Sequence, residues 1–149
     1  MSAPRQGKVY YLAGPMTYYP QFNYPAFFKA AGLLRGNGYE IISPAEQDDA
    51  ETLKEIMASE DGVLTHNLPS WGEFLSHDVK LVADQVDGVI CLDNWWESRG
   101  ACVEAFIATL CGKPVYKYDF YHKDLMTLIE PEAIAHATGQ KLLAIAKAA

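Results

Sequence analysis

Residues 87–118 read DGVICLDNWWESRGACVEAFIATLCGKPVYKY, and this stretch decides the expected fold. Asp87–Leu92 is an uninterrupted apolar run, which predicts a buried strand. Ala101–Cys111 is long and apolar enough for a buried helix, and Gly112 ends it. Because Lys113–Tyr118 predicts another strand, the stretch forms a strand–helix–strand unit of a parallel sheet.

The same alternation runs through the N-terminal half of the chain. Lys8–Ala13 and Tyr39–Ile42 are short β-prone runs, and apolar residues recur at helical spacing between Asn23 and Gly36. Asn23 is placed to cap that helix, and Trp71–Gln85 predicts a further helix. The sequence therefore predicts an α/β fold with a parallel sheet covered by helices on both faces.

One domain spanning residues 1–149 accounts for the sequence. With 149 residues, 50% of them hydrophobic and 21% charged, the composition is that of an ordinary globular domain. Residues 45–70 depart from the alternation and predict an insertion with one short helix. A helical C-terminus is expected over about residues 120–149.

Charge and hydropathy limit the partners that we expect. The formal net charge is −7, from 12 Lys and Arg residues against 19 Asp and Glu residues. Because a nucleic-acid backbone requires a basic face, no nucleic acid polymer is expected, although a helix N-terminus can hold a small phosphate ligand. No apolar run reaches the roughly 18 residues of a membrane span, and the N-terminus lacks the apolar segment of a signal peptide. We therefore expect no membrane association.

The cysteines and histidines predict neither a disulfide nor a metal site. Cys91, Cys102 and Cys111 lie in apolar runs without CxxC spacing, which is typical of reduced, buried thiols in a cytoplasmic protein. The four histidines show no ligand spacing, so no metal is expected.

Three loops are expected to border a ligand-binding crevice. In parallel sheets, ligands bind beyond the carboxyl ends of the strands, where the strand order reverses. The loops that leave these ends are Gly14–Asn23, Ser43–Ser70 and Asp93–Gly100.

Glu104 is the only charged residue in the apolar helix. A helix without a polar face is normally buried, so Glu104 is expected near the core, close to the helix start where the crevice opens. A carboxylate removed from water is costly unless it is paired or functional. The alternative is a structural glutamate that reaches solvent or bonds to a neighbouring backbone amide.

Asp78 is a second carboxylate in an apolar setting. It follows Phe74 by four residues and precedes Val82 by four, so helical spacing places it on the stripe that those residues bury. The alternative is a residue at the edge of the stripe that points outward. Two carboxylates facing one crevice are what glycosidic-bond cleavage uses, one as nucleophile or base and the other as acid.

Ser98 stands where the N-cap of the apolar helix is expected, and Arg99 and Gly100 follow it. The free backbone amides and the helix dipole make this turn a candidate anion site. A phosphate there would bring the sugar C1′ near Glu104, six residues further on. The alternative is an ordinary cap that binds nothing.

Aromatic side chains gather around the expected crevice. Tyr11 lies near the end of the first strand, where its hydroxyl could hold Glu104; a core or edge-strand tyrosine is the alternative. The loops carry further aromatic residues that suit stacking on a planar base, or a patch for self-association: Tyr18, Tyr19, Phe22, Trp95 and Trp96.

Several segments in this order resemble the nucleoside 2-deoxyribosyltransferase superfamily, in particular a small, phage-type branch that is similar to 2′-deoxynucleoside 5′-phosphate N-hydrolases. The resemblance runs from about Val9 to Val115 and implies a flavodoxin- or Rossmann-like three-layer sandwich. Its sheet would be doubly wound and mainly parallel, with about five strands. The segments that carry it are Tyr11–Thr17 (YLAGPMT), Phe22–Phe27 (FNYPAF), Gly38–Glu40 (GYE), Ser43–Glu46 (SPAE) and Trp96–Glu104 (WESRGACVE).

The resemblance also implies roles for individual residues. Glu104 matches the nucleophile at C1′, and Asp78 matches an aspartate that assists at the base or activates the acceptor. Tyr11 matches a tyrosine that supports the nucleophile, and Ser98 matches a serine that binds the 5′-phosphate in the nucleotide N-hydrolases. Arg99 departs from the usually uncharged residue and could add a phosphate contact. The other substrate-binding residues that we expect are Gly14, Pro15, Asn23, Gly100 and Trp95.

The leading expectation is an enzyme that cleaves the N-glycosidic bond of a (deoxy)nucleoside 5′-monophosphate, without a cofactor because the carboxylates supply nucleophile and proton. One alternative is a nucleoside 2-deoxyribosyltransferase that exchanges bases on unphosphorylated deoxynucleosides. A second is a non-catalytic nucleotide-binding or sensing module, and a third is a structural protein. A homo-oligomer, a dimer or larger, is expected from the apolar C-terminal helix and the loop aromatics.

Overall fold

A five-stranded sheet forms the centre of the molecule, in the computed structural model that describes residues 4–63, 71–119, 121–122 and 125–148. The strand order is β2-β1-β3-β4-β5; the first four strands are parallel, and β5 is antiparallel to β4. The strands are β1 (Val9–Ala13), β2 (Glu40–Ile42), β3 (Gly88–Cys91), β4 (Val115–Asp119) and β5 (Leu125–Leu128). This confirms the predicted α/β class and the mainly parallel sheet of about five strands.

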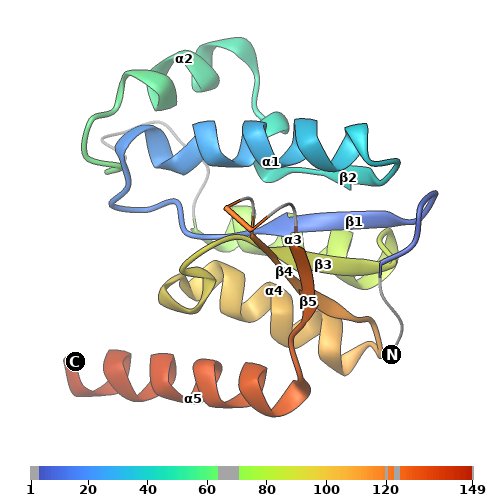
Figure 1. Ribbon diagram of the computed structural model, residues 1–149. Coiled ribbons are helices and arrows are strands. Elements are labelled where there is room, and N and C mark those ends of the chain that lie inside the picture. Colours follow the sequence, from blue (N-terminus) through green and yellow to red (C-terminus); the bar gives the residue numbers. More distant parts are fainter. Residues whose placement is uncertain (1–3, 64–70, 120, 123–124, 149) are drawn as a thin grey trace.

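Helices cover both faces of the sheet, as Figure 1 shows. On one side α1 (Tyr24–Gly36) packs on the strands, with α2 (Ala50–Ala58) beyond it; on the other side lie α3 (Trp71–Asp84), α4 (Arg99–Leu110) and α5 (Pro131–Ala148). The short 3-10 turns are η1 (Pro20–Asn23), η2 (Pro44–Glu46) and η3 (Trp95–Glu97). The arrangement is a Rossmann-like three-layer sandwich.

Side chains alternate between the two cores along β1. Tyr10 and Leu12 join the core under α1, whereas Tyr11 and Ala13 join the core under α3 and α4. This alternation follows from the two-residue period of a strand. It turns Tyr11 toward the helices that carry both predicted carboxylates.

The strand order reverses between β1 and β3, so the loops that leave these neighbouring strands diverge to opposite faces. In the register, Tyr11 lies beside Ile42 of β2 and Val89 of β3. Because β1, β2 and β3 are parallel, the loops that follow them all begin at the same end of the sheet. This is the position at which the sequence predicts a ligand-binding crevice.

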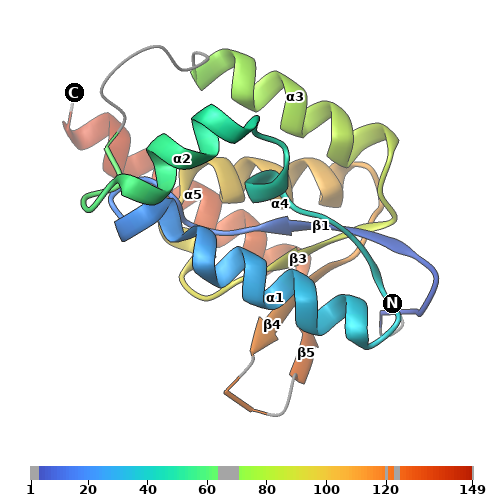
Figure 2. The same ribbon diagram turned by 90° about the horizontal axis from the view of Figure 1, so that it is seen from above.

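The C-terminal part differs from the helix expected over residues 120–149. Leu125–Leu128 forms β5, which pairs with the open side of β4, and the helix begins only at Pro131. Backbone pairing with an exposed edge strand outweighs the local helical preference of this apolar run. Figure 2 shows the β4–β5 hairpin extending away from the helices.

Other local predictions meet mixed outcomes. The segment predicted as an insertion with one short helix contains α2, and its residues 64–70 lie outside the described part of the chain. Cys91 and Cys102 are free and buried as expected, but Cys111 is exposed because it follows the last turn of α4. Within the described residues, no helix is both long and apolar enough to cross a bilayer.

Candidate active site

Glu104 lies in the core, one and a half turns into α4, and is 6% exposed. The buried residues beside it on α4 are Ala and Cys, so the helix packs closely on the sheet and carries the carboxylate inward. The hydroxyl of Tyr11 donates a 2.7 Å hydrogen bond to Oε2 of Glu104. The predicted support of Glu104 by Tyr11 is therefore present, and the alternative of a solvated glutamate is wrong.

Asp78 comes to the same place from α3. It is half-buried on the inner side of the helix, and it lies close enough to Glu104 and Tyr11 to interact with both through hydrogen bonding and charge. The alternative in which Asp78 points away from the site is therefore wrong. Helical spacing from Phe74 to Val82 was sufficient to predict this.

The protonation of the two carboxyl groups is coupled. Burial raises the pKa of Glu104 well above its usual range, and the nearby charge of Asp78 raises it further. Burial also raises the pKa of Asp78. Since two close carboxylates are not readily ionised together, the pair can hold one proton between them. Burial raises the pKa of Tyr11 as well, so its hydroxyl remains a donor.

Asp48 and Tyr24 extend the cluster on the β2 side, and both escaped the sequence reasoning as site residues. Tyr24, the first residue of α1, donates a hydrogen bond from its hydroxyl to Oδ2 of Asp48. Asp48 is half-buried in the turn between η2 and α2, and its charge acts on Asp78. The one feature of the sequence that could have indicated a role for Asp48 is its position in the loop after β2, which was predicted to border the crevice.

The N-terminus of α4 forms the turn predicted as an anion site. Ser98 is the N-cap, and its Oγ accepts a 3.1 Å hydrogen bond from the amide of Ala101. The guanidinium of Arg99 stacks over the ring of Trp71, with its central carbon 5.0 Å from the ring centroid. A side chain at Gly100 would meet the same indole, so Trp71 and Arg99 together flank the turn.

The loop after β1 is held by its own polar groups. Asn23 does not cap α1 as predicted, because its backbone is left-handed (φ 62°) instead of extended. Its side-chain amide donates to the carbonyl of Pro15, at 3.0 Å. Gly14 lies where a Cβ would come within 3.1 Å of Leu92, so glycine allows the loop to pass closely over the end of β3. These contacts fix the path of the loop after β1.

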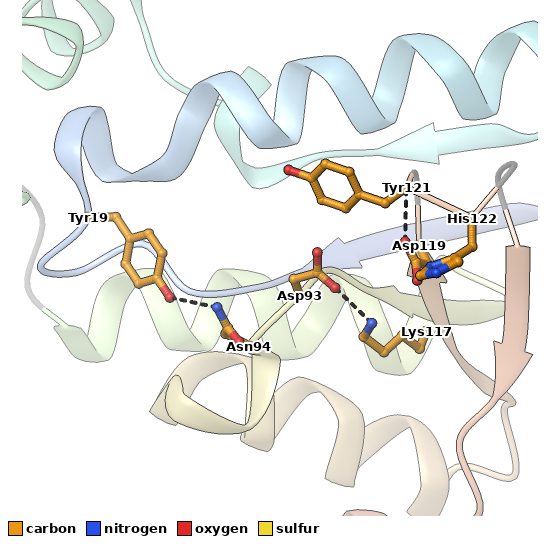
Figure 3. Close-up of polar contacts among 7 residues, drawn as sticks. All are labelled: Tyr19, Asp93, Asn94, Lys117, Asp119, Tyr121 and His122. Carbon is orange, nitrogen blue, oxygen red and sulfur yellow. Dashed lines mark hydrogen bonds and ion pairs between the residues drawn. The ribbon is translucent and has the colours of Figure 1, made fainter.

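Polar contacts join β4 to the loops around it, as Figure 3 shows. Lys117 of β4 forms an ion pair with Asp93, with Nζ 2.7 Å from Oδ1. Asn94 donates to the hydroxyl of Tyr19 at 3.4 Å, which joins this loop to the one after β1. Asp119 accepts from the amide of Tyr121 at 2.8 Å and pairs with His122.

Trp95 is not placed at the crevice mouth as predicted for base stacking. It is 5% exposed and packs in the core shared by α3, α4 and α5, where its edge also borders a groove with Lys117 and Ala133. The neighbouring Trp96 meets it edge to face and is 46% exposed. An indole followed by a second indole gives no sequence signal for which one is buried.

The structure therefore brings Tyr11 and Glu104, which are buried, together with the half-buried Asp78, and Asp48 interacts with this cluster through Asp78. Among the described residues, no group of three His, Cys, Asp or Glu side chains could hold a metal ion. The chemistry available at the cluster is nucleophilic attack by one carboxylate and proton transfer by the other.

Comparison with known families matches residues 8–117 to the family described as Domain of unknown function (DUF4406), and the chain belongs to this family. The matched range runs from just before β1 into β4, so it includes Tyr11, Asp48, Asp78 and Glu104. No curated protein matches the chain.

Proposed function

We propose that this member of the DUF4406 family cleaves the N-glycosidic bond of a (deoxy)nucleoside 5′-monophosphate and releases the free base and the sugar phosphate. The observation that carries the proposal is the buried Glu104, hydrogen-bonded to Tyr11 and in contact with Asp78. The resemblance of the sequence to nucleoside 2-deoxyribosyltransferases and nucleotide N-hydrolases supports the same reaction.

The cluster can supply both groups that the reaction needs. Transfer of the shared proton to Asp78 leaves Glu104 as a carboxylate whose Oε2 is oriented by Tyr11. An oxygen of Glu104 attacks C1′ while the bond from C1′ to the base nitrogen breaks. The bonding electrons go to the base, and Asp78 delivers the proton.

The second half of the reaction restores the enzyme. Asp78, now ionised, takes a proton from water as the water oxygen attacks C1′ and displaces the Glu104 carboxylate. The sugar phosphate leaves with a new hydroxyl at C1′. If a second base attacks in place of water, the same residues catalyse base exchange, which is the transferase alternative.

The N-terminus of α4 is the proposed phosphate site. The cap of Ser98 occupies the amide of Ala101, and the amides of Arg99 and Gly100 precede it in the first turn. Such amides and the helix dipole favour an anion. Glu104 follows Ser98 by six residues, so about 9 Å of helix separates this end of α4 from the carboxylate.

Two further parts of the proposal concern the setting of the enzyme. The exposed thiol of Cys111 and the absence of a disulfide among the described cysteines fit a reducing, cytoplasmic compartment. Exposed leucines on α4 and α5 fit a homo-oligomer. Small nucleotides or nucleosides are the proposed ligands.

The test is chromatographic detection of free base from a panel of nucleosides and their 5′-monophosphates, in deoxy and ribo forms. Each reaction is run with and without a competing base. We expect base release from monophosphates by the wild-type protein and none by Glu104→Gln. The matched control is Glu55→Gln, which makes the same change at an exposed glutamate of α2.

The other outcomes distinguish the alternatives. Base exchange without release in water would make the protein a transferase. Ligand-induced thermal stabilisation without turnover would favour a nucleotide sensor. Full activity of Glu104→Gln would refute the assignment of the nucleophile.

A further inference from the structure

The three carboxyl groups Glu104, Asp78 and Asp48 are connected through Asp78. Glu104 interacts with Asp78 and Tyr11, and Asp78 in turn interacts with Asp48. Asp48 accepts a hydrogen bond from Tyr24, and the charge of Asp78 acts on Tyr24 as well. Asp78 is therefore the carboxyl group that interacts with both of the others.

The sheet topology separates Asp48 from the N-terminus of α4. The loop after β3 leads into the N-terminus of α4, whereas Asp48 follows β2, and β1 with Tyr11 lies between these strands. If the proposed function holds, the phosphate end of the substrate lies at the β3 side and C1′ lies at Glu104. The base then extends past Asp78 toward the β2 side, where Asp48 stands.

Asp48 is half-buried, and a hydrogen bond from a buried tyrosine restricts its side chain. Tyr24 is buried at the start of α1, and its hydroxyl donates to Oδ2 of Asp48. The next residue, Asp49, is used differently: its Oδ1 caps α2 by accepting a 2.7 Å hydrogen bond from the amide of Thr52. The turn thus presents one carboxylate to the crevice side and commits the other to the helix.

We propose that Asp48 reads the nucleobase and selects bases that carry an exocyclic amine over bases with a carbonyl at the same ring position. This inference rests on the proposed function. A carboxylate accepts hydrogen bonds from an amino group, whereas a base carbonyl facing it would leave two acceptors opposed. The tyrosine tether keeps Asp48 from turning aside, so the mismatch is not easily relieved.

The test uses matched substrates that differ at one position. These are the deoxynucleoside 5′-monophosphates of cytosine and uracil, and those of adenine and hypoxanthine. We expect the wild-type kcat/KM to favour the amino base of at least one pair by about tenfold or more, because an unpaired polar group in a site strongly penalises the wrong substrate.

Asp48→Asn replaces a carboxylate that only accepts hydrogen bonds with an amide that can also donate one to a base carbonyl. We expect the amino-over-carbonyl ratio to fall by about tenfold in the pair that the wild type prefers. Asp49→Asn is the matched control, because asparagine also caps helices well, and its ratio should equal that of the wild type. If Asp48→Asn does not fold, Tyr24→Phe removes the tether and should lower the ratio in the same direction.

Failure of the inference differs from failure of the proposed function. Base release in which carbonyl bases are preferred, or in which the ratio is the same in both Asp48→Asn and wild type, would overturn the inference alone. No base release from any of the four substrates would overturn the proposed function and the inference with it.

Discussion

At the scale of single residues, the buried Glu104 carboxyl is the costliest feature of the molecule to explain as structure. The Tyr11 hydrogen bond offsets part of that cost, but Asp78 adds to it, because a second carboxylate stands where a stabilising cation would be expected. A purely structural site would be more stable with an amide or an apolar side chain. A cost that is retained in this way is typical of functional sites.

This cost predicts a specific dependence of stability on pH. The pKa of Glu104 is raised in the folded state, so its contribution to stability is complete below the unfolded pKa and is lost as pH rises through the folded pKa. Glu104→Gln cannot ionise and should lack this loss. We expect the variant to be more stable than the wild type by about 1 kcal/mol or more at pH 8, with little difference near pH 4.

The measurement is chemical unfolding at a series of pH values. Glu55→Gln on the exposed face of α2 is the control and should follow the wild-type profile. Parallel profiles for wild type and Glu104→Gln would contradict a raised pKa at Glu104 and, with it, the proton-sharing pair.

At the scale of elements, the N-terminus of α4 combines a structural and a proposed binding role that can be separated. Ser98→Ala removes the cap on the Ala101 amide and should lower the free energy of unfolding by about 1 kcal/mol. If the same turn binds phosphate, the variant should also raise KM for a nucleoside 5′-monophosphate and leave the unphosphorylated nucleoside unaffected. Steady-state kinetics on both substrates measures this.

A second N-cap offers the matched control. Asp49→Ala removes the cap of α2 and should cost stability while leaving the preference for phosphorylated substrate unchanged. A Ser98→Ala variant that loses stability but keeps its KM for the monophosphate would limit Ser98 to a structural role.

The elements also show how far sequence reasoning can reach. The inward positions of Glu104 and Asp78 were predictable, because helical periodicity places a charged residue in an apolar helix, or on its apolar stripe, toward the core. Asp48 was not, since its approach to the cluster depends on how the turn after β2 folds over α1, which no local periodicity records. The predictions for Trp95, at the crevice mouth, and for Leu125–Leu128, in a helix, were wrong for a related reason. Long-range packing decides the environment of Trp95, and sheet pairing decides that of Leu125–Leu128.

At the scale of the whole molecule, the parallel pairing of β1 to β4 follows from the alternation of strands and helices, with the right-handed crossovers that such units adopt. The alternation does not predict the pairing of β5 with β4, because these two strands are antiparallel and are joined by a hairpin without a helix between them. This hairpin leaves α5 to pack beside α4 on one face of the sheet. That packing leaves apolar side chains of both helices in solvent.

The exposed apolar residues of these two helices predict self-association. Leu110 of α4 is 69% exposed and Leu142 of α5 is 64% exposed, and the same helices also expose Phe106, Leu143 and Ile145. Burying such a surface against a second copy would stabilise a dimer if each partner covers roughly 800 Å².

We expect light scattering to show a mass that is a multiple of the chain mass. The double variant Leu110→Lys with Leu142→Lys should be a monomer, whereas Glu55→Lys on α2, beyond the other face of the sheet, should not change the mass. A monomeric wild type at micromolar concentration, or a double variant that still associates, would contradict this interface.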